Sequence, residues 1–315
     1  ANKVGKKILM SGGGRCNFTN IYTESTNFLS QNPHFCKSAL SRFTPADFIA
    51  LVNNHEIAFH EKKLGQVFCD DKARNILDML LQEARATIRT HCSVEKVSAL
   101  DNGFEIETRL GKVRAQSLVV ATGGLSIPKM GATAFGYELA KQFGLNIVPV
   151  RAGLVPFTLD KIILDKLSQL SGSSLEVIAS CNEMSFKENL LFTHRGLSGP
   201  AILQISSYWK PGDELTINLL PDIDLNEVLQ EKQQTRAKAE LKTVLAEYMS
   251  RKMAQLLIEL WFVDMDYANK VMNQFTKQQL QDIAERFHSW KLKPSGTEGY
   301  RTAEVTFGGV NTDEL

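Results

Sequence analysis

Residues 7–17 read Lys7-Ile8-Leu9-Met10-Ser11-Gly12-Gly13-Gly14-Arg15-Cys16-Asn17, and this stretch decides the fold that we expect. The steps up to Met10 suit a short strand. Three consecutive glycines let backbone N–H groups approach a ligand without Cβ clashes, and Arg15 adds a planar cationic fork. The stretch therefore predicts a turn that binds an anionic or nucleotide-like ligand; a plain glycine-rich surface turn is the alternative.

A second stretch points the same way. Residues 117–124 read Ser117-Leu118-Val119-Val120-Ala121-Thr122-Gly123-Gly124. An apolar run bounded by glycines predicts a buried strand of a parallel sheet, and open α/β sheets bind ligands where such strands end. A short helix over 137–143 is expected to follow, with Gly144 as its stop. Strand, glycine turn, loop and helix are typical of a nucleotide-binding unit.

Neither stretch meets a strict fingerprint. The pattern Gly12-x-Gly14-x-x-Asn17 lacks the last glycine of the dinucleotide motif, and the spacing Gly131-x-x-x-x-Gly136 is followed by a tyrosine instead of the lysine of a phosphate loop. The residues alone therefore leave the type of nucleotide open.

Four long motifs occur in order along the chain. They are Lys7-Ile8-Leu9-Met10-Ser11-Gly12-Gly13-Gly14-Arg15-Cys16-Asn17-Phe18-Thr19-Asn20, Ala121-Thr122-Gly123-Gly124-Leu125-Ser126-Ile127-Pro128, Leu191-Phe192-Thr193-His194-Arg195-Gly196-Leu197-Ser198-Gly199-Pro200, and Glu298-Gly299-Tyr300-Arg301 with Glu304-Val305-Thr306-Phe307-Gly308-Gly309-Val310. In these motifs the chain resembles the YhiN/BaiN-like flavoproteins, which are NAD(P)/FAD-dependent oxidoreductases. The resemblance spans essentially all 315 residues.

The resemblance implies an α/β fold: a two-dinucleotide-binding (Rossmann-like) FAD domain with a large inserted α+β region. The implied parts are the first part of the FAD domain (1–149), an inserted antiparallel β subdomain (150–222), an inserted helical subdomain (223–295) and the return to the FAD domain (296–315). The family's N-terminal Gly-x-Gly-x-x-Gly unit and its C-terminal flavin-closing segment have no counterpart in these residues. We therefore expect the sequence to be part of a longer protein.

The resemblance also implies FAD as the cofactor and NAD(P)H as a candidate electron donor. The residues expected at the cofactor are Lys7, Ser11, Gly12, Gly13, Gly14, Arg15, Cys16, Asn17, Val94, Ala121, Thr122, Gly123, Gly124, Gly131, Gly308 and Gly309. Arg15 would stabilise negative charge on a phosphate or on the reduced flavin, and Asn17 would donate to ring carbonyls. Cys16 is either a redox thiol or a small residue packed near the flavin. Gly308 and Gly309 are either flavin-lining residues or a β-bulge.

His194 and Arg195 are the expected catalytic residues. They lie in a Gly/Ser-rich loop of the expected insertion. One would donate or accept a proton, and the other would anchor a carboxylate or a carbonyl. The alternative is that both hold the loop through hydrogen bonds to the backbone.

The composition of the chain limits the kinds of partner that we expect it to bind. The chain has 36 Lys and Arg against 35 Asp and Glu, a formal charge of +1, so no electrostatic case exists for nucleic acid or an anionic membrane. This balance also disfavours a third possibility, tRNA modification by a flavoprotein of related fold. Five scattered cysteines without a Cys-x-x-Cys pattern predict neither a disulfide framework nor a metal site, and indicate the reducing cytoplasm. No apolar run reaches the roughly 18 residues that span a bilayer.

Local signals predict further elements. They are a helix from Thr44-Pro45 to Asn54, a hairpin of 57–60 and 66–69, a helix capped by Asp71, a hairpin of 94–100 and 104–108, a strand at 214–219, several helices within 224–290, one of them with a capping box at Thr276, and a strand at 302–306.

The sequence thus predicts an FAD-dependent oxidoreductase that transfers hydride between a small organic substrate and flavin. Reduction of steroid-like enones and oxidation of small aminoketones are both compatible with the resemblance. The alternative is a non-catalytic flavin- or nucleotide-binding module whose insertion binds another protein. Substrate identity and oligomeric state stay open.

Overall fold

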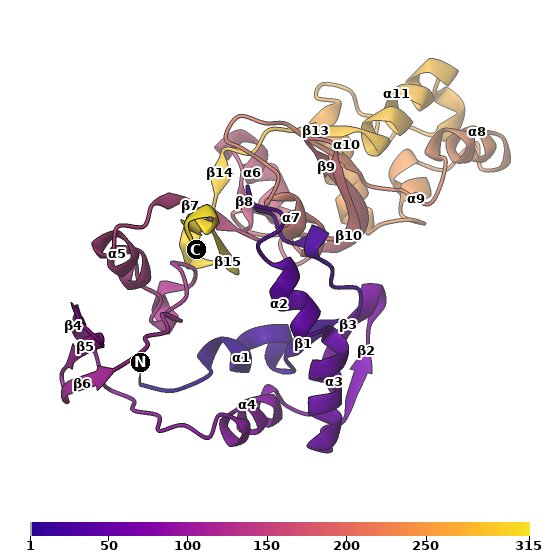
Figure 1. Cartoon of the computed structure of the whole chain (residues 1–315). Helices are drawn as coiled ribbons and strands as arrows, with labels where there is room; N and C mark the ends of the chain where they lie inside the picture. The colour runs from indigo at the N-terminus through magenta and orange to yellow at the C-terminus, as the bar shows by residue number, and fades with distance from the viewer. Residues whose placement is uncertain (1) are drawn as a thin grey trace. The chain divides into compact units, whose positions relative to one another are not determined.

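The computed structural model describes residues 2–315 and divides into two compact units (Figure 1). Unit 1 comprises the chain up to Gly123 together with Thr133–Val148 and Val310–Leu315, and unit 2 comprises Gly124–Ala132 and Pro149–Gly309. The helices are α1 (Lys6–Met10), α2 (Lys37–Arg42), α3 (Pro45–Asn54), α4 (Ala73–Glu83), α5 (Phe135–Gln142), α6 (Lys161–Leu167), α7 (Pro200–Ile205), α8 (Leu225–Thr235), α9 (Leu241–Leu245), α10 (Arg251–Trp261) and α11 (Lys277–His288).

The strands form four sheets. They are β1 (Asn17–Asn20), β2 (Phe59–Glu61), β3 (Gln66–Cys69), β4 (Val94–Leu100), β5 (Gly103–Thr108), β6 (Gly111–Ala115), β7 (Ile147–Gly153), β8 (Phe157–Thr158), β9 (Ser174–Cys181), β10 (Met184–Phe192), β11 (Gly196–Ser198), β12 (Leu215–Asn218), β13 (Trp290–Leu292), β14 (Gly296–Thr297) and β15 (Val305–Val310).

The first sheet of unit 1 has the order β1-β3-β2, with antiparallel pairs. The expected hairpin of 57–60 and 66–69 is confirmed as β2 and β3, with Phe59 opposite Cys69. The expected strand before the glycines is wrong: Lys6–Met10 forms α1. Gly5 precedes it in a left-handed conformation that lets α1 pack on α4, since a Cβ on Gly5 would lie 2.3 Å from Leu77 Cδ1. This contact favours a helical turn over an extended chain.

The helices expected in unit 1 are confirmed, except that one of them has a different cap residue. Helix α3 begins after a capping box in which the Thr44 hydroxyl accepts from the Asp47 N–H, with Pro45 in the first turn. In α4 the cap is Lys72 instead of the expected Asp71, and no side chain of the described residues caps the helix. The expected stop of α5 is confirmed, because Gly144 has φ +84° and its N–H donates to the Lys141 carbonyl.

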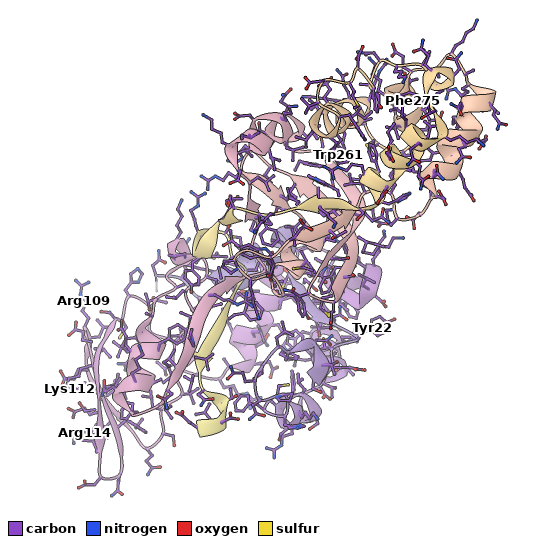
Figure 2. All side chains as sticks on the ribbon, turned by 90° about the horizontal axis from the view of Figure 1, so that it is seen from above. Tyr22, Arg109, Lys112, Arg114, Trp261 and Phe275 are labelled. Carbon is purple, nitrogen blue, oxygen red and sulfur yellow. The ribbon has the colours of Figure 1, made fainter. Side chains whose placement is uncertain are left out.

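The expected hairpin around residues 101–103 is confirmed and gains a third strand, giving the order β4-β5-β6. Arg109, Lys112 and Arg114 are spread along this sheet, Arg109 in the β5–β6 turn and Lys112 and Arg114 on β6 (Figure 2). The ammonium of Lys112 and the guanidinium of Arg114 each lie within 3.0 Å of a Glu105 carboxylate oxygen. Much of the hairpin's positive charge is therefore neutralised by its own strands.

The expected buried strand at residues 117–122 is wrong. These residues form no regular secondary structure, and Val119 is 85% exposed. A parallel strand needs a neighbour to take its backbone hydrogen bonds. No strand within residues 2–315 pairs with this run.

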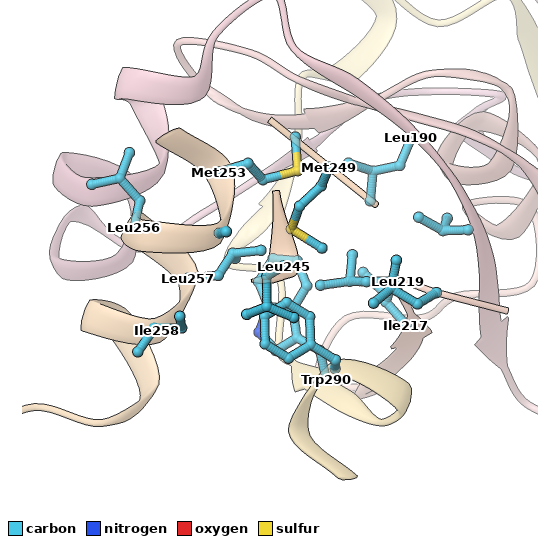
Figure 3. Packing of buried hydrophobic residues seen from close by; sticks show 14 of the residues in the cluster. Leu190, Ile217, Leu219, Leu245, Met249, Met253, Leu256, Leu257, Ile258 and Trp290 are labelled. Carbon is cyan, nitrogen blue, oxygen red and sulfur yellow. The ribbon is translucent and has the colours of Figure 1, made fainter. Parts of the chain in front are cut away.

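Unit 2 is built on a seven-stranded sheet with the order β13-β12-β9-β10-β11-β8-β14. Its strands carry buried residues at alternate positions, such as Leu215 and Ile217 of β12. Helices α8–α11 cover this core with their apolar sides, and Leu257, Leu245 and Trp290 meet in it (Figure 3). The expected strand at 214–219, the helices within 224–290 and the capping box at Thr276 are all confirmed.

A two-stranded sheet pairs β7 with β15. The expected strand at 302–306 is partly wrong, because the strand begins only at Val305 and Gly299–Arg301 form a 3₁₀ turn. Gly153 ends β7 directly against the Phe307 ring, where a Cβ would lie 2.1 Å from two ring carbons. Only glycine allows this approach.

A histidine connects α11 to the start of α8 in unit 2. The N–H of Leu225 donates to His288 Nε2 at 3.0 Å, so the ring's proton lies on Nδ1, which is 3.1 Å from Asn218 Oδ1 and donates to it. Burial lowers the pKa of His288, and nearby Asp224 opposes that shift. The folded protein therefore prefers the neutral ring.

We expect His288 to make unit 2 less stable in mild acid. Its folded pKa lies below the unfolded value near 6.5, so the unfolded chain binds the proton first. The stabilisation is complete above about pH 6.5 and is lost as pH falls towards the folded pKa. Urea unfolding followed from about pH 7.5 to about pH 5 should show this slope reduced in His288→Gln. The exposed His194→Gln should keep it, and equal slopes in all three proteins would contradict the assignment.

Candidate functional site

The glycine turn of unit 1 is left-handed throughout. Gly12, Gly13 and Gly14 have φ values of +57°, +66° and +88°. The turn is closed by the Cys16 N–H, which donates to the Ser11 carbonyl at 3.0 Å, while the Ser11 hydroxyl donates to the Ile8 carbonyl at 2.9 Å. L-residues with side chains avoid this backbone conformation, so consecutive glycines are required here.

The three glycines have different surroundings. A Cβ on Gly12 would lie 2.7 Å from the Phe68 ring and 2.8 Å from the Asn17 backbone nitrogen, whereas a Cβ on Gly13 or Gly14 would meet no atom within 4 Å. Gly12 is therefore the packed base of the turn. Gly13 and Gly14 present bare backbone to open space, as a cofactor-binding turn requires.

The side chains around the turn divide into exposed and structural ones. Lys7 and Arg15 are exposed, so the Arg15 guanidinium is available for an anionic group. The Asn17 amide is oriented to donate to the carbonyls of Thr19 and Val67, at 3.0 and 3.2 Å. The bond to Val67 holds β1 on β3, whereas the bond to Thr19 lies within β1. Both compete with the expected bonds from Asn17 to a flavin ring.

Cys16 is a packed residue in this structure. It is 5% exposed and belongs to the small core formed with Val52, Cys69 and Ile76. Burial raises the pKa of its thiol, which keeps the sulfur protonated and weakly nucleophilic. Of the two roles left open for Cys16, the environment favours the small packed residue.

The expected partners of the turn within unit 1 lie elsewhere along the chain. Val94 begins β4 opposite Thr108. Ala121, Thr122 and Gly123 are exposed, and Gly123 has φ +73° with open space beside it. Thr122 lies against the start of α5, where a Cβ on Gly136 would be 2.6 Å from its hydroxyl oxygen. The hydrogen bonds described for residues 2–315 do not join residues 121–123 to the turn at 12–14, so their shared cradle stays a prediction.

Unit 2 brings together two of the other predicted segments. The N–H groups of Leu125 and Ser126 donate to the Thr306 hydroxyl at 2.9 and 3.0 Å, and the Ile127 N–H donates to the Tyr300 carbonyl at 2.7 Å. The segment that begins at Gly124 is thereby tied to β15, which carries the predicted Gly308 and Gly309. Gly131 follows the same segment with φ +96° and open space beside it.

The expected catalytic loop of unit 2 is held by a small ionic cluster. The Thr193 hydroxyl accepts from the N–H groups of Arg195 and Gly196. The Arg195 guanidinium lies 3.6 Å from the Glu298 carboxylate, and that of Arg301 lies 3.7 Å from it. His194 is exposed beside this cluster. Backbone bonds thus shape the loop, and both side chains named in the sequence reach its surface.

The sequence reasoning missed an aromatic pocket in unit 1. Phe18, Phe43 and Phe48 wall a cavity of about 270 Å³. The available signal was composition, since residues 25–46 hold Phe43, Lys37 and Arg42 without a single carboxylate, and Phe18 and Phe48 lie on either side of this segment.

The turn fits a flavin dinucleotide in chemical terms. Exposed left-handed backbone without Cβ atoms suits close approach of a phosphate or a ring edge, and Arg15 adds positive charge next to it. Among residues 2–315, no group of three or more His, Cys, Asp or Glu side chains is placed to hold a metal ion. The exposed backbone turn and the neighbouring Arg15 make the site a candidate for an organic, anionic cofactor.

Comparison with known proteins defines the class. The family model described as "HI0933-like protein Rossmann domain" matches residues 1–315. The chain belongs to this family, and the expected fold class and family resemblance are confirmed.

Three curated relatives are similar over nearly the whole chain. Ribosomal RNA dihydrouridine synthase of Escherichia coli is 53% identical over 317 residues, which cover 99% of this chain and 78% of the relative. The protein of the same name from Haemophilus influenzae is 46% identical over 98% of this chain and 78% of the relative. A 3-dehydro-bile acid delta(4,6)-reductase of Clostridium scindens is 24% identical over 99% of this chain and 79% of the relative.

These relatives correct two expectations. The expected transfer of hydride to or from a small organic substrate is wrong, because the relatives at 53% and 46% identity are named for a reaction on ribosomal RNA. The expected absence of a nucleic-acid partner is wrong for the same reason. All three names are those of enzymes, which supports the expected enzyme class and the expected oxidoreductase and flavoprotein character. No helix within residues 2–315 is long and apolar enough to cross a membrane.

Substitutions at two glycines of the turn should distinguish a role in packing from a role in cofactor binding. Gly12→Ala should lower the free energy of unfolding by about 2–4 kcal/mol, because its methyl group meets the Phe68 ring in a strained conformation. Gly13→Ala should cost only about 1 kcal/mol of strain, and it should lower the flavin-to-protein ratio of the purified protein. Urea unfolding and absorbance of the released flavin measure the two effects. A Gly13→Ala protein with full flavin content would exclude the turn as a cofactor site.

Proposed function

We propose that this protein is a flavin-dependent dihydrouridine synthase that acts on ribosomal RNA. The observation that carries the proposal is the 53% identity, over 99% of this chain, to the Escherichia coli protein of that name. The second relative of the same name, at 46%, supports it independently. The exposed glycine turn supports the flavin part.

The name of the product defines the chemistry. Dihydrouridine differs from uridine by two hydrogens across the C5=C6 bond of the base, so the reaction adds a hydride equivalent and a proton and removes one π bond. Bound FAD, reduced by NADH or NADPH, would supply the two electrons. The nicotinamide donor is part of the proposal and is the simplest two-electron source.

The chain's own residues would hold the cofactor and exclude competing reactions. Gly13 and Gly14 would bring backbone against the FAD, and Arg15 would neutralise charge on it. The other residues named for this role are Lys7, Ser11, Gly12, Cys16, Asn17, Val94, Ala121, Thr122, Gly123, Gly124, Gly131, Gly308 and Gly309. Among them, Gly12, Ser11 and Asn17 act by shaping the turn, because their contacts are internal.

We also propose the domain organisation that the resemblance implies. Residues 1–149 and 296–315 would form the FAD-binding domain, with 150–222 and 223–295 inserted as a β and a helical subdomain. The continuous core of unit 2, which combines strands of the first insert with helices of the second, supports treating the two inserts as one folded body.

His194 and Arg195 are proposed to act on the nucleotide. An exposed imidazole is suited to move a proton, and a guanidinium is suited to anchor a uracil carbonyl or an RNA phosphate. Glu298 holds Arg195 from one side and leaves part of it exposed. A ribosomal RNA substrate also places the activity in the cytoplasm, where ribosomes are made.

The proposed reaction is tested with the flavin-loaded protein, NADPH or NADH, and ribosomal RNA transcribed without modifications. We expect dihydrouridine in the nucleosides released from the RNA, identified by mass spectrometry, with one nicotinamide oxidised for each uridine reduced. Boiled protein is the control. Nicotinamide oxidation that is coupled to an enone but never yields dihydrouridine would refute the RNA substrate.

A second prediction concerns Arg195. Arg195→Ala should reduce dihydrouridine formation by about tenfold to a hundredfold, the effect of losing one charged substrate contact, while flavin content and thermal stability stay unchanged. Arg301→Ala, which removes the other cation beside Glu298, is the matched control and should be milder. Equal loss in both variants would show that Arg195 acts only through the ionic cluster.

A further inference from the structure

An apolar pocket opens immediately after the glycine turn. Strand β1 leaves the turn at Asn17, and its next residue, Phe18, lines the pocket together with Phe43 and Phe48. Leu40 and Pro45 complete the apolar wall. A volume of about 270 Å³ exceeds that of a single pyrimidine or purine ring system. The pocket is therefore large enough for one flat base.

The aromatic rings that line the pocket pack against one another, and one of them is partly exposed to solvent. The rings of Phe18 and Phe48 lie 5.7 Å apart, and those of Phe43 and Phe48 lie 6.2 Å apart at 70°. Phe48 holds the edge of the Phe43 ring, yet Phe43 is 55% exposed. A face of a large apolar ring left in water at the mouth of a pocket is suited to stack with a planar ligand.

The segment that precedes Phe43 carries two cations. Residues 25–46 contain Lys37 and Arg42 and no Asp or Glu, and both cations lie on α2 directly before Phe43. The nearest carboxylate along the chain after this segment, Asp47, accepts from the N–H and the hydroxyl of Thr44, each at 2.7 Å. These bonds lower the pKa of Asp47, so it stays charged while it caps α3. Asp313 also contacts the segment, accepting from the Asn32 amide at 2.9 Å. An anion at α2 would thus meet two exposed cations.

Further exposed aromatic rings continue this surface along the chain. Tyr22, Phe28 and Phe35 are 66%, 46% and 49% exposed, and Figure 2 shows Tyr22 at the surface of unit 1. Exposed rings combined with cations and without carboxylates are the composition of single-strand nucleic-acid binders, in which bases stack on rings and phosphates meet Lys or Arg. A protein partner would need apolar area but has no requirement for unopposed positive charge.

We propose that this aromatic pocket binds an unpaired base of the RNA strand, with Lys37 and Arg42 on the neighbouring phosphates. The proposal rests on the proposed function, since it names how that substrate is held. The pocket's polar groups are threonine hydroxyls, so it recognises a base by stacking, with little preference among bases.

The test measures RNA binding separately from catalysis. The flavin-loaded protein is titrated into a fluorescent single-stranded uridine-rich oligonucleotide and into the same sequence as a duplex. Phe43→Ala should weaken single-strand binding about tenfold, and Phe43→Trp should restore it. Phe143→Ala is the matched control, because Phe143 is 40% exposed and also makes an edge contact, with Phe104; it should bind like the unmodified protein.

The cations are tested in the same way. Lys37→Ala with Arg42→Ala should weaken binding and flatten its dependence on salt, whereas Lys96→Ala with Lys141→Ala, two exposed lysines elsewhere in unit 1, should not. Flavin content and thermal melting of each variant confirm that it is folded.

The outcomes separate this inference from the proposed function. Unchanged single-strand binding in Phe43→Ala overturns the pocket, even if dihydrouridine is still made. Self-association that disappears in Phe43→Ala, without any RNA binding, assigns the surface to a second copy and also overturns it. Binding that depends on Phe43 in a protein that forms no dihydrouridine supports the pocket and refutes the proposed reaction.

Discussion

The close approach of Gly12 to the Phe68 ring is the constraint on which the candidate site depends. No side chain fits between them, so the chain must turn there with left-handed glycines. Gly13 and Gly14 consequently face open space, and β1 is directed onto β3, where the Asn17 amide donates to the Val67 carbonyl. One packing contact in unit 1 thus lies beside both an accessible backbone turn and, four residues after Gly14, the first residue of an aromatic pocket, Phe18.

Elements with local signals were predictable from the sequence. The Thr44–Asp47 capping box and the turn at Asp101-Asn102-Gly103 fix their structures within a few residues. The apolar runs at 7–10 and 117–122 do not, because a strand exists only through a partner that can lie far away in sequence. Near Lys6 the partner is α4, reached through Gly5, and the run becomes a helix.

The candidate site, too, was predictable from the sequence only where its signal is local. Three consecutive glycines indicate a left-handed backbone conformation, so the turn could be predicted from the sequence. The exposure of Phe43 could not, because a phenylalanine in a sequence is expected in a core, and its surroundings depend on Phe18 and Phe48. Net charge misled for a related reason. A total of +1 averages over the chain, whereas an RNA strand responds to local groups such as Lys37 and Arg42.

The central claim is that a reduced flavin bound at the glycine turn passes two electrons to a uridine of ribosomal RNA. The most direct measurement mixes the anaerobically reduced, flavin-loaded protein with unmodified ribosomal RNA and follows the visible absorbance of the flavin in a single turnover. The account predicts that the flavin is reoxidised and that dihydrouridine appears in equal amount. Flavin that stays reduced with the RNA, yet is reoxidised by a small enone, would contradict it.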